Sequence, residues 1–129
     1  MLKNNINKSL VTLPSNLASR NIRSNLYNKY LKAKQIKHSI NKKGSICWRY
    51  TFLYSGNRNL FFEKVRKENI DISSWYPALY KMYSNQKSTF FKNSNILDRQ
   101  IVNLWVSPEY SIKKIINNIK KINKILNQL

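Results

Sequence analysis

The N-terminal third of the chain carries apolar side chains at helical spacing. Ile22, Leu26 and Tyr30 recur four residues apart, which places them on one face of a helix. Ser15 precedes this pattern and is a suitable N-cap, because its hydroxyl can accept a hydrogen bond from a backbone N–H of the first turn. We therefore predict a helix from Ser15 to about Ile36.

Polar segments flank this predicted helix. Residues 1–12 are mostly polar, and we expect them to form a loose N-terminal segment ahead of a domain that spans residues 13–129. Residues 37–45, with the sequence KHSINKKGS, are charged and end near a glycine, which favours a loop.

The clearest predicted strand runs from Ile46 to Tyr54. In this stretch, ICWRYTFLY, residue types that favour strands alternate with a period of two. Turn-forming residues with a capping asparagine follow, and they predict a helix from about Asn59 to Glu68. Asn69 then stands where many helices end in a left-handed residue. One face of the strand would carry Ile46, Trp48, Tyr50, Phe52 and Tyr54, and the other face would carry Cys47, Arg49, Thr51 and Leu53.

Two further strands are predicted downstream. The first runs from Ile70 to Tyr76, and Pro77 ends it because proline cannot donate to a sheet ladder. Residues 78–99 show no regular period, and we expect them to be irregular. Residues 101–106, IVNLWV, form a short continuous apolar run, which is typical of a strand covered on both faces.

The C-terminal segment predicts a long amphipathic helix. Ser107 would be its N-cap, Pro108 its first residue and Glu109 the acid of its first turn. The order of elements predicts an α/β (α+β) fold, in which helices pack on a small sheet of about three strands. The apolar stripe of the last helix would consist of Ile112, Ile115, Ile116, Ile119, Ile122, Leu126 and Leu129.

Composition narrows the class of protein. The chain has 129 residues, 42% of them apolar, which is enough for one domain with a core. No apolar run approaches the roughly 20 residues that span a membrane, and the N-terminus lacks the features of a secretory signal. The single cysteine, Cys47, cannot form an internal disulfide, which fits a reducing compartment. We expect a cytoplasmic protein with no membrane partner.

The formal net charge of +19 permits two interpretations. Lysines that neutralise phosphates release counterions, so a strongly basic chain can bind nucleic acid. Alternatively, a composition rich in Asn, Lys and Ile places lysines at solvated positions. The lysines are scattered along the chain, which favours compositional bias and argues against specific nucleic-acid binding. A free-standing basic nucleic-acid-binding module stays as the alternative function.

The usual catalytic constellations are hard to assemble from this sequence. One histidine, His38, and one cysteine cannot supply a closed zinc site, so we expect a solvated His38 and a Cys47 in the core. Two glycines cannot make a Gly-rich phosphate loop, and the five acidic residues are expected to be surface charges. We therefore predict no catalytic, cofactor-binding or metal-binding residue. This pattern suits part of an enzyme whose catalytic groups lie elsewhere.

Three segments, taken in order, carry a resemblance to a known family. Residues 20–31, RNIRSNLYNKYL, form a predicted arginine-rich helix, and residues 47–83 form a strand, a helix and a strand that ends in a tyrosine-proline turn. Residues 99–122, RQIVNLWVSPEYSIKKIINNIKKI, form a closing strand and last helix. Over about residues 13–129, this arrangement resembles the C-terminal small domain of the DegT-type (DegT/DnrJ) nucleotide-sugar aminotransferases.

The resemblance implies a fragment of a pyridoxal phosphate (PLP) enzyme of the aspartate-aminotransferase fold. In that family a preceding large domain carries the lysine that binds PLP and the aspartate that pairs with its pyridine nitrogen, and this sequence has a counterpart of neither. The complete enzyme would transfer an amino group from glutamate to a keto nucleotide-sugar. We expect this chain to bind no PLP alone, to be inactive alone, and to partner a large domain in a homodimer.

The tyrosine-proline turn is the expected contact with the substrate. The family often ends this turn with proline, an apolar residue and histidine. Here the letters are PALY, so Tyr80 takes the histidine position and cannot titrate near neutral pH. The resemblance implies that Trp75, Tyr76 and Tyr80 line the small-domain wall of a substrate cleft. The alternative is that Trp75 and Tyr76 are core residues at a strand end.

Overall fold

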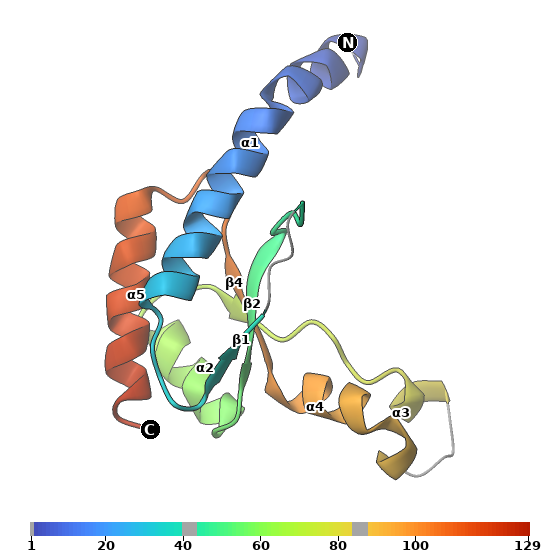
Figure 1. Ribbon diagram of the computed structural model, residues 1–129, viewed down its shortest axis with the longest axis vertical. Coiled ribbons are helices and arrows are strands. Elements are labelled where there is room, and N and C mark those ends of the chain that lie inside the picture. The colour runs from blue at the N-terminus through green and yellow to red at the C-terminus, as the bar shows by residue number, and fades with distance from the viewer. Residues whose placement is uncertain (1, 40–43, 84–87) are drawn as a thin grey trace.

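An antiparallel sheet forms the centre of the computed structural model, which describes residues 2–39, 44–83 and 88–129 (Figure 1). The four strands lie in the order β1-β2-β4-β3, and each neighbouring pair is antiparallel. This confirms the expected fold class, helices packed on a small sheet, with four strands instead of about three. The strands are β1 (Ile36–His38), β2 (Arg49–Tyr54), β3 (Ile72–Ser73) and β4 (Ile101–Trp105).

Helices from both ends of the chain and from its middle cover one face of the sheet. α1 and α5 pack side by side, and α2 packs against α5 and β3 (Figure 1). The remaining helices lie at the other side of the sheet, where α4 contacts β2 and β4. The helices are α1 (Leu2–Tyr30), α2 (Arg58–Lys67), α3 (Tyr80–Tyr83) and α4 (Lys92–Gln100), followed by α5 (Ile112–Leu126); a 3-10 turn, η1 (Ser88–Phe91), precedes α4.

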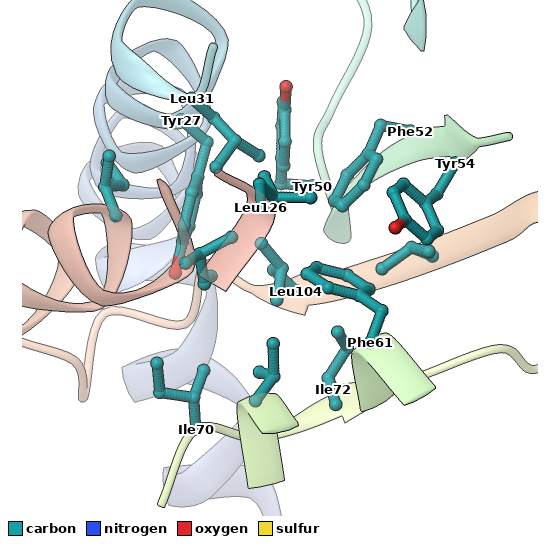
Figure 2. Close-up of a cluster of buried hydrophobic side chains, with 14 of the residues drawn as sticks. Tyr27, Leu31, Tyr50, Phe52, Tyr54, Phe61, Ile70, Ile72, Leu104 and Leu126 are labelled. Atoms are coloured by element: carbon teal, nitrogen blue, oxygen red, sulfur yellow. The ribbon is translucent and has the colours of Figure 1, made fainter. Parts of the chain in front are cut away.

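Aromatic side chains of β2 form the centre of the core, as Figure 2 shows. The strand alternates, so that Tyr50, Phe52 and Tyr54 are each about 1% exposed while the residues between them are half-buried. Tyr54 and Phe61 pack with ring centroids 4.7 Å apart, and Tyr27 of α1 stacks on Tyr50 at 5.1 Å. This confirms the predicted alternation of the strand over the residues that pair.

The first helix is longer than the sequence pattern predicted. α1 begins at Leu2 and contains Pro14, so residues 2–12, expected to be loose, are helical. Ser15 is not the N-cap: its hydroxyl donates to the carbonyl of Thr12 at 2.8 Å, inside the helix. The polar composition hid this part of the helix, because an exposed helix need not carry the apolar stripe by which a sequence predicts it.

Three other segments differ from the prediction. Residues 37–45 were expected to be a loop, but Lys37 and His38 belong to the edge strand β1, which pairs with β2; residues 40–43 of this call lie outside the described residues. The strand expected over residues 70–76 is reduced to Ile72–Ser73. Within residues 78–99, expected to be irregular, the structure has α3, η1 and most of α4. Each of these elements is short or polar, and tertiary contacts decide its conformation more than periodicity does.

The helix caps agree with the prediction in the middle of the chain and differ at its end. Asn57 caps α2, and its side chain accepts from the backbone N–H three residues later at 3.1 Å. Asn69 is left-handed with φ 56°, as predicted. The last helix is capped by Ser111 and not by Ser107. The Tyr110 N–H donates to the Ser107 carbonyl at 3.0 Å, so the predicted first turn is a separate turn.

Candidate functional site

A row of polar side chains crosses the sheet face that lies opposite the core. Thr51, Asn103 and Ser73 are aligned by the strand registers. The Thr51 hydroxyl donates to Asn103 Oδ1 at 2.9 Å, and Asn103 Nδ2 donates to the Ser73 carbonyl at 3.4 Å. Asn103 is only 1% exposed, so these bonds satisfy an amide that is shielded from water.

Next to this row, two indole rings hold the guanidinium of Arg49. Arg49 pairs with Trp105 across β2 and β4, and its Cζ lies 3.5 Å from the Trp105 ring centroid and 4.0 Å from that of Trp75. The two indoles are nearly perpendicular, at 86°. Both distances are well inside the range of cation–π attraction. Burial by these rings lowers the pKa of Arg49, and the nearby Tyr76 hydroxyl opposes that shift.

The two aromatic residues before Pro77 point toward solvent. Trp75 is 62% exposed and Tyr76 is 56% exposed, so the alternative that they are core residues is wrong. They stand beside the Arg49 guanidinium on the sheet face opposite the core. Their contact with a substrate stays a prediction.

The backbone of the turn that follows is held by an acid on α4. The Ala78 N–H donates to Asp98 Oδ1 at 3.1 Å, and the Lys81 ammonium forms an ion pair with the same carboxylate. The hydrogen bond from Lys81 is the main cause that lowers the pKa of Asp98. Arg58 Nη1 donates to the Asp98 carbonyl at 2.5 Å, which ties α4 to the start of α2. Sequence reasoning treated Asp98 as a surface charge and missed this positioning role, because α4 was not predicted.

Tyr80 lies apart from the other two predicted site residues. Its hydroxyl donates to Asn95 Oδ1, and its ring stacks on Phe91 with centroids 4.6 Å apart and planes 8° apart. Its partners therefore belong to η1 and α4, whereas those of Trp75 belong to β2 and β4. The structure brings Trp75 and Tyr76 together with Arg49, and it places Tyr80 at the far end of the same turn.

A surface hollow of about 480 Å³ lies beside the indole pair. Three of the residues around it, Ser73, Trp75 and Trp105, are the ones that contact Arg49. The hollow therefore adjoins the best-defined cluster of polar and aromatic groups outside the core. Its other lining residues are Arg66, Asn69, Ile70, Asp71 and Ile72.

The two residues considered for metal or nucleophilic chemistry are structural. Cys47 is 8% exposed and belongs to the core, as predicted. His38 was expected to be solvated and is half-buried instead: its Nδ1 contacts the hydroxyl of the buried Tyr50, and burial lowers the pKa of His38. Among the described residues, no three side chains of His, Cys, Asp or Glu gather as a metal site. No helix in the described part is long and apolar enough to cross a membrane.

The side chains that the structure describes offer neither an enclosed lysine nor a phosphate-binding loop that would hold PLP. Aminotransferase chemistry needs PLP to be held and oriented by the protein, and the family does this with a lysine amine and donors for the PLP phosphate. Among the side chains that the structure describes, every lysine is at least partly exposed, so none is enclosed in a shielded site. The two glycines are isolated and make no phosphate-binding loop.

Comparison with known proteins identifies the fold. No protein-family model and no curated protein matches the chain. Solved structures do match: the aminotransferase TlmJ from Streptoalloteichus hindustanus is 13% identical over 95% of this chain, with a TM-score of 0.84. The PLP-form of Spr1654, a candidate sugar aminotransferase from Streptococcus pneumoniae, is 17% identical over 92%, with a TM-score of 0.78. A DegT DnrJ EryC1 StrS aminotransferase from Brucella abortus is 20% identical over 91%, with a TM-score of 0.73.

The chain spans about a third of the length of each of these structures: 35%, 33% and 33%, respectively. The match takes in nearly all of this chain, so its sheet and helices are together one part of the aminotransferase fold. The expected resemblance is confirmed at the level of the fold.

Proposed function

We propose that this chain serves as the small domain of a DegT-type, PLP-dependent sugar aminotransferase. The observation that carries the proposal is the shared fold, which covers 95% of this chain and 35% of the TlmJ aminotransferase. The three sequence segments that resemble the family support the same assignment. In this proposal the large domain, joined to this chain or separate from it, binds PLP, and the complete enzyme transfers an amino group from glutamate to a keto nucleotide-sugar.

The tyrosine-proline turn would then form one wall of the substrate cleft. Trp75 and Tyr76 offer exposed aromatic faces there, and the backbone between them and Tyr80 is fixed by Asp98. Tyr80 completes the wall at its far end, where Phe91 stacks against its ring. A fixed wall suits an enzyme site, because orientation of the substrate is a large part of what the protein supplies in cofactor chemistry.

Exposed apolar residues indicate where the large domain would pack. Leu79 and Met82 are 62% and 65% exposed next to the turn, and Leu10 and Val11 are 61% and 81% exposed on the N-terminal half of α1. That half of α1 projects beyond the rest of the molecule (Figure 1). Apolar surface of this kind is typical of a protein interaction site.

The similar structures reported above are aminotransferases, and they lend no support to the nucleic-acid-binding alternative.

Reconstitution tests the proposal. The chain should be co-expressed with a large domain that carries the PLP lysine and is encoded in the same genome. Amino transfer from glutamate to a keto nucleotide-sugar should then be measured. We expect activity with both parts and none with either alone. A Trp75→Ala/Tyr76→Ala variant should raise KM, since it removes the wall, while a Phe90→Ala variant of an exposed aromatic on η1 should not.

Absorbance spectroscopy of the isolated chain mixed with PLP can contradict the proposal. Mixed with PLP, the isolated chain should show no stoichiometric absorbance band of PLP bound to a lysine after dilution. A stable band that maps to one of its own lysines would show that the cofactor site lies in this chain. The proposal that the large domain binds PLP would then be wrong.

A further inference from the structure

Among the residues that the structure describes, Arg49 uses few of its hydrogen-bond donors. A guanidinium carries five N–H donors, and in the part of the chain that the structure describes Arg49 donates to the Ser73 hydroxyl, at the long distance of 3.5 Å from Nη1. Among the described residues, no carboxylate forms an ion pair with it. Arg49 is half-buried, so its remaining donors are not shut away from solvent and a ligand can reach them.

The contrast with Arg23 shows what a structural arginine looks like in this fold. Arg23 is 7% exposed and donates to the carbonyl of Tyr110 at 2.7 Å and to that of Pro108 at 3.0 Å. Its Nη1 also donates to the Ser19 carbonyl at 2.8 Å and to the Ser19 hydroxyl, so most of its donors are used within the protein. Arg49, by comparison, lies against two indoles, and most of its donors have no partner among the described residues.

The surroundings of Arg49 suit an anionic ligand with a flat ring. Trp75, one of its two indole partners, is 62% exposed, and the Tyr76 hydroxyl lies close enough to act on the charge of Arg49. The adjoining hollow also holds Arg66 and Asn69, a second cation and an amide. Its one acid, Asp71, already accepts a hydrogen bond from the Tyr110 hydroxyl.

We propose that Arg49 binds an oxyanion, a phosphate or a carboxylate, on the sheet face opposite the core, with the Trp75 ring beside it. The planar guanidinium matches two oxygens of such a group at once, and the two indoles hold it so that little side-chain entropy is lost on binding. The inference rests on the proposed function for the source of the oxyanion, which is the diphosphate of the nucleotide-sugar or the carboxylate of the amino donor.

The three tryptophans make the site directly observable. In a two-dimensional NMR spectrum of the full chain, the indole N–H signals of Trp75 and Trp105 should shift saturably as inorganic pyrophosphate is added. Trp48 is the internal control: it is 68% exposed and lies under a different arginine, Arg20, at 5.0 Å. Loose attraction of anions to a chain of net charge +19 would move all three signals together. Parallel shifts of the three indoles would overturn the proposal.

Matched variants decide whether Arg49 is the binding group. Arg49→Gln should weaken pyrophosphate binding by about tenfold or more, because hydrogen bonds to charged groups are worth roughly 1.5–3 kcal/mol each. Arg99→Gln removes the same charge from an exposed position on α4 and should weaken binding less than about twofold. Equal weakening by both variants would show that only net charge matters, and the site would not exist.

A second variant keeps the test decisive if Arg49→Gln loses its folded circular dichroism spectrum. Arg49→Lys retains the charge and the long stem but has no planar fork, so it should bind pyrophosphate measurably more weakly than the parent chain. Unchanged affinity in Arg49→Lys would overturn the proposal.

Separate titrations with uridine diphosphate and with glutamate identify the source of the oxyanion. The ligand that saturates the Trp75 and Trp105 shifts at the lower concentration is the one the site takes. These measurements use the chain without a large domain, so they succeed or fail independently of the reconstitution that tests the proposed function.

Discussion

The two faces of the sheet differ in the side chains that they carry: one face is the apolar core, and the other carries the polar row and Arg49. On β2, Tyr50 and Phe52 enter a buried aromatic core, whereas Arg49 and Thr51, which alternate with them, lie on the opposite face with the indole pair and the polar row. Both sets come from one six-residue strand. Because alternate residues of a strand point to opposite faces, one face can stabilise the fold while the other carries groups that can bind a ligand.

The core face is shielded enough to change the chemistry of its polar atoms. Burial raises the pKa of Tyr50 and of Tyr27 well above the ordinary value, so both phenols stay neutral. Each has a polar partner nearby: His38 contacts the Tyr50 hydroxyl, and Asn118 hydrogen-bonds the Tyr27 hydroxyl. On the opposite face the β2 residues Arg49, Thr51 and Leu53 are half-buried, whereas Asn103 beside them is shielded.

The largest effect in this comparison should come from emptying the core face. Phe52 is about 1% exposed and packs on Tyr50 and Phe61 with centroids 5.9 Å and 6.5 Å away. Phe52→Ala should lower the free energy of unfolding by about 3–5 kcal/mol, through lost burial and the cavity left behind. Urea denaturation followed by circular dichroism measures this change.

Leu53, the next residue of β2, lies on the other face and provides the matched control for Phe52→Ala. Leu53→Ala truncates a half-buried residue of the same strand and should cost only about 1 kcal/mol. If Leu53→Ala were as destabilising as Phe52→Ala, the two faces would contribute equally to stability, and the division described above would not hold.

Much of the core face could be predicted from the sequence, and the limits of that prediction are instructive. The alternation correctly placed Tyr50, Phe52 and Tyr54 on one buried face. It failed for Trp48, which shares their parity but is 68% exposed, because β2 begins only at Arg49. Parity carries information about burial only where the residues are paired in a sheet.

The candidate site was less accessible to sequence reasoning because tertiary contacts create it. Trp75 and Tyr76 were singled out by their place before Pro77, but the role of Arg49 depends on its register with Trp105. Nothing along the chain signals that register. Likewise, Asp98 reaches the turn because it lies on α4. This helix is polar and has no buried residue, so the sequence shows no strong apolar stripe that would predict it.

A smaller effect should come from breaking the polar row across the sheet. Thr51→Val keeps the shape of the side chain but removes the hydroxyl that donates to the buried Asn103. The unsatisfied amide oxygen should cost about 1–3 kcal/mol in urea denaturation. Thr51→Ser keeps the hydroxyl and should cost less. Equal stability of the Val and Ser variants would mean that the row does not stabilise the opposite face.

The smallest effect concerns pH and the turn that carries the candidate site. The Lys81 hydrogen bond lowers the pKa of Asp98 in the folded chain, whereas unfolding returns this carboxyl to an ordinary value of about 3.9. A carboxyl whose pKa is lowered by folding contributes stability above its unfolded pKa and loses that contribution as pH falls through the folded value. Asp98→Asn should therefore be less stable than the parent at about pH 7, by below about 1 kcal/mol, and the gap should close toward about pH 2.

The Ala78 amide gives a local measurement of the same titration, since its N–H donates to Asp98 Oδ1. Its chemical shift should follow pH with a midpoint below the ordinary range of an aspartate, and Asp98→Asn should abolish that titration. A control variant, Glu63→Gln, removes an exposed acid that is paired with Lys67 on α2 and should leave the Ala78 titration unchanged. A midpoint at or above the ordinary value would mean that Asp98 does not hold the turn through its charge. The wall of the proposed cleft would then depend on the stacking of Tyr80 on Phe91 instead.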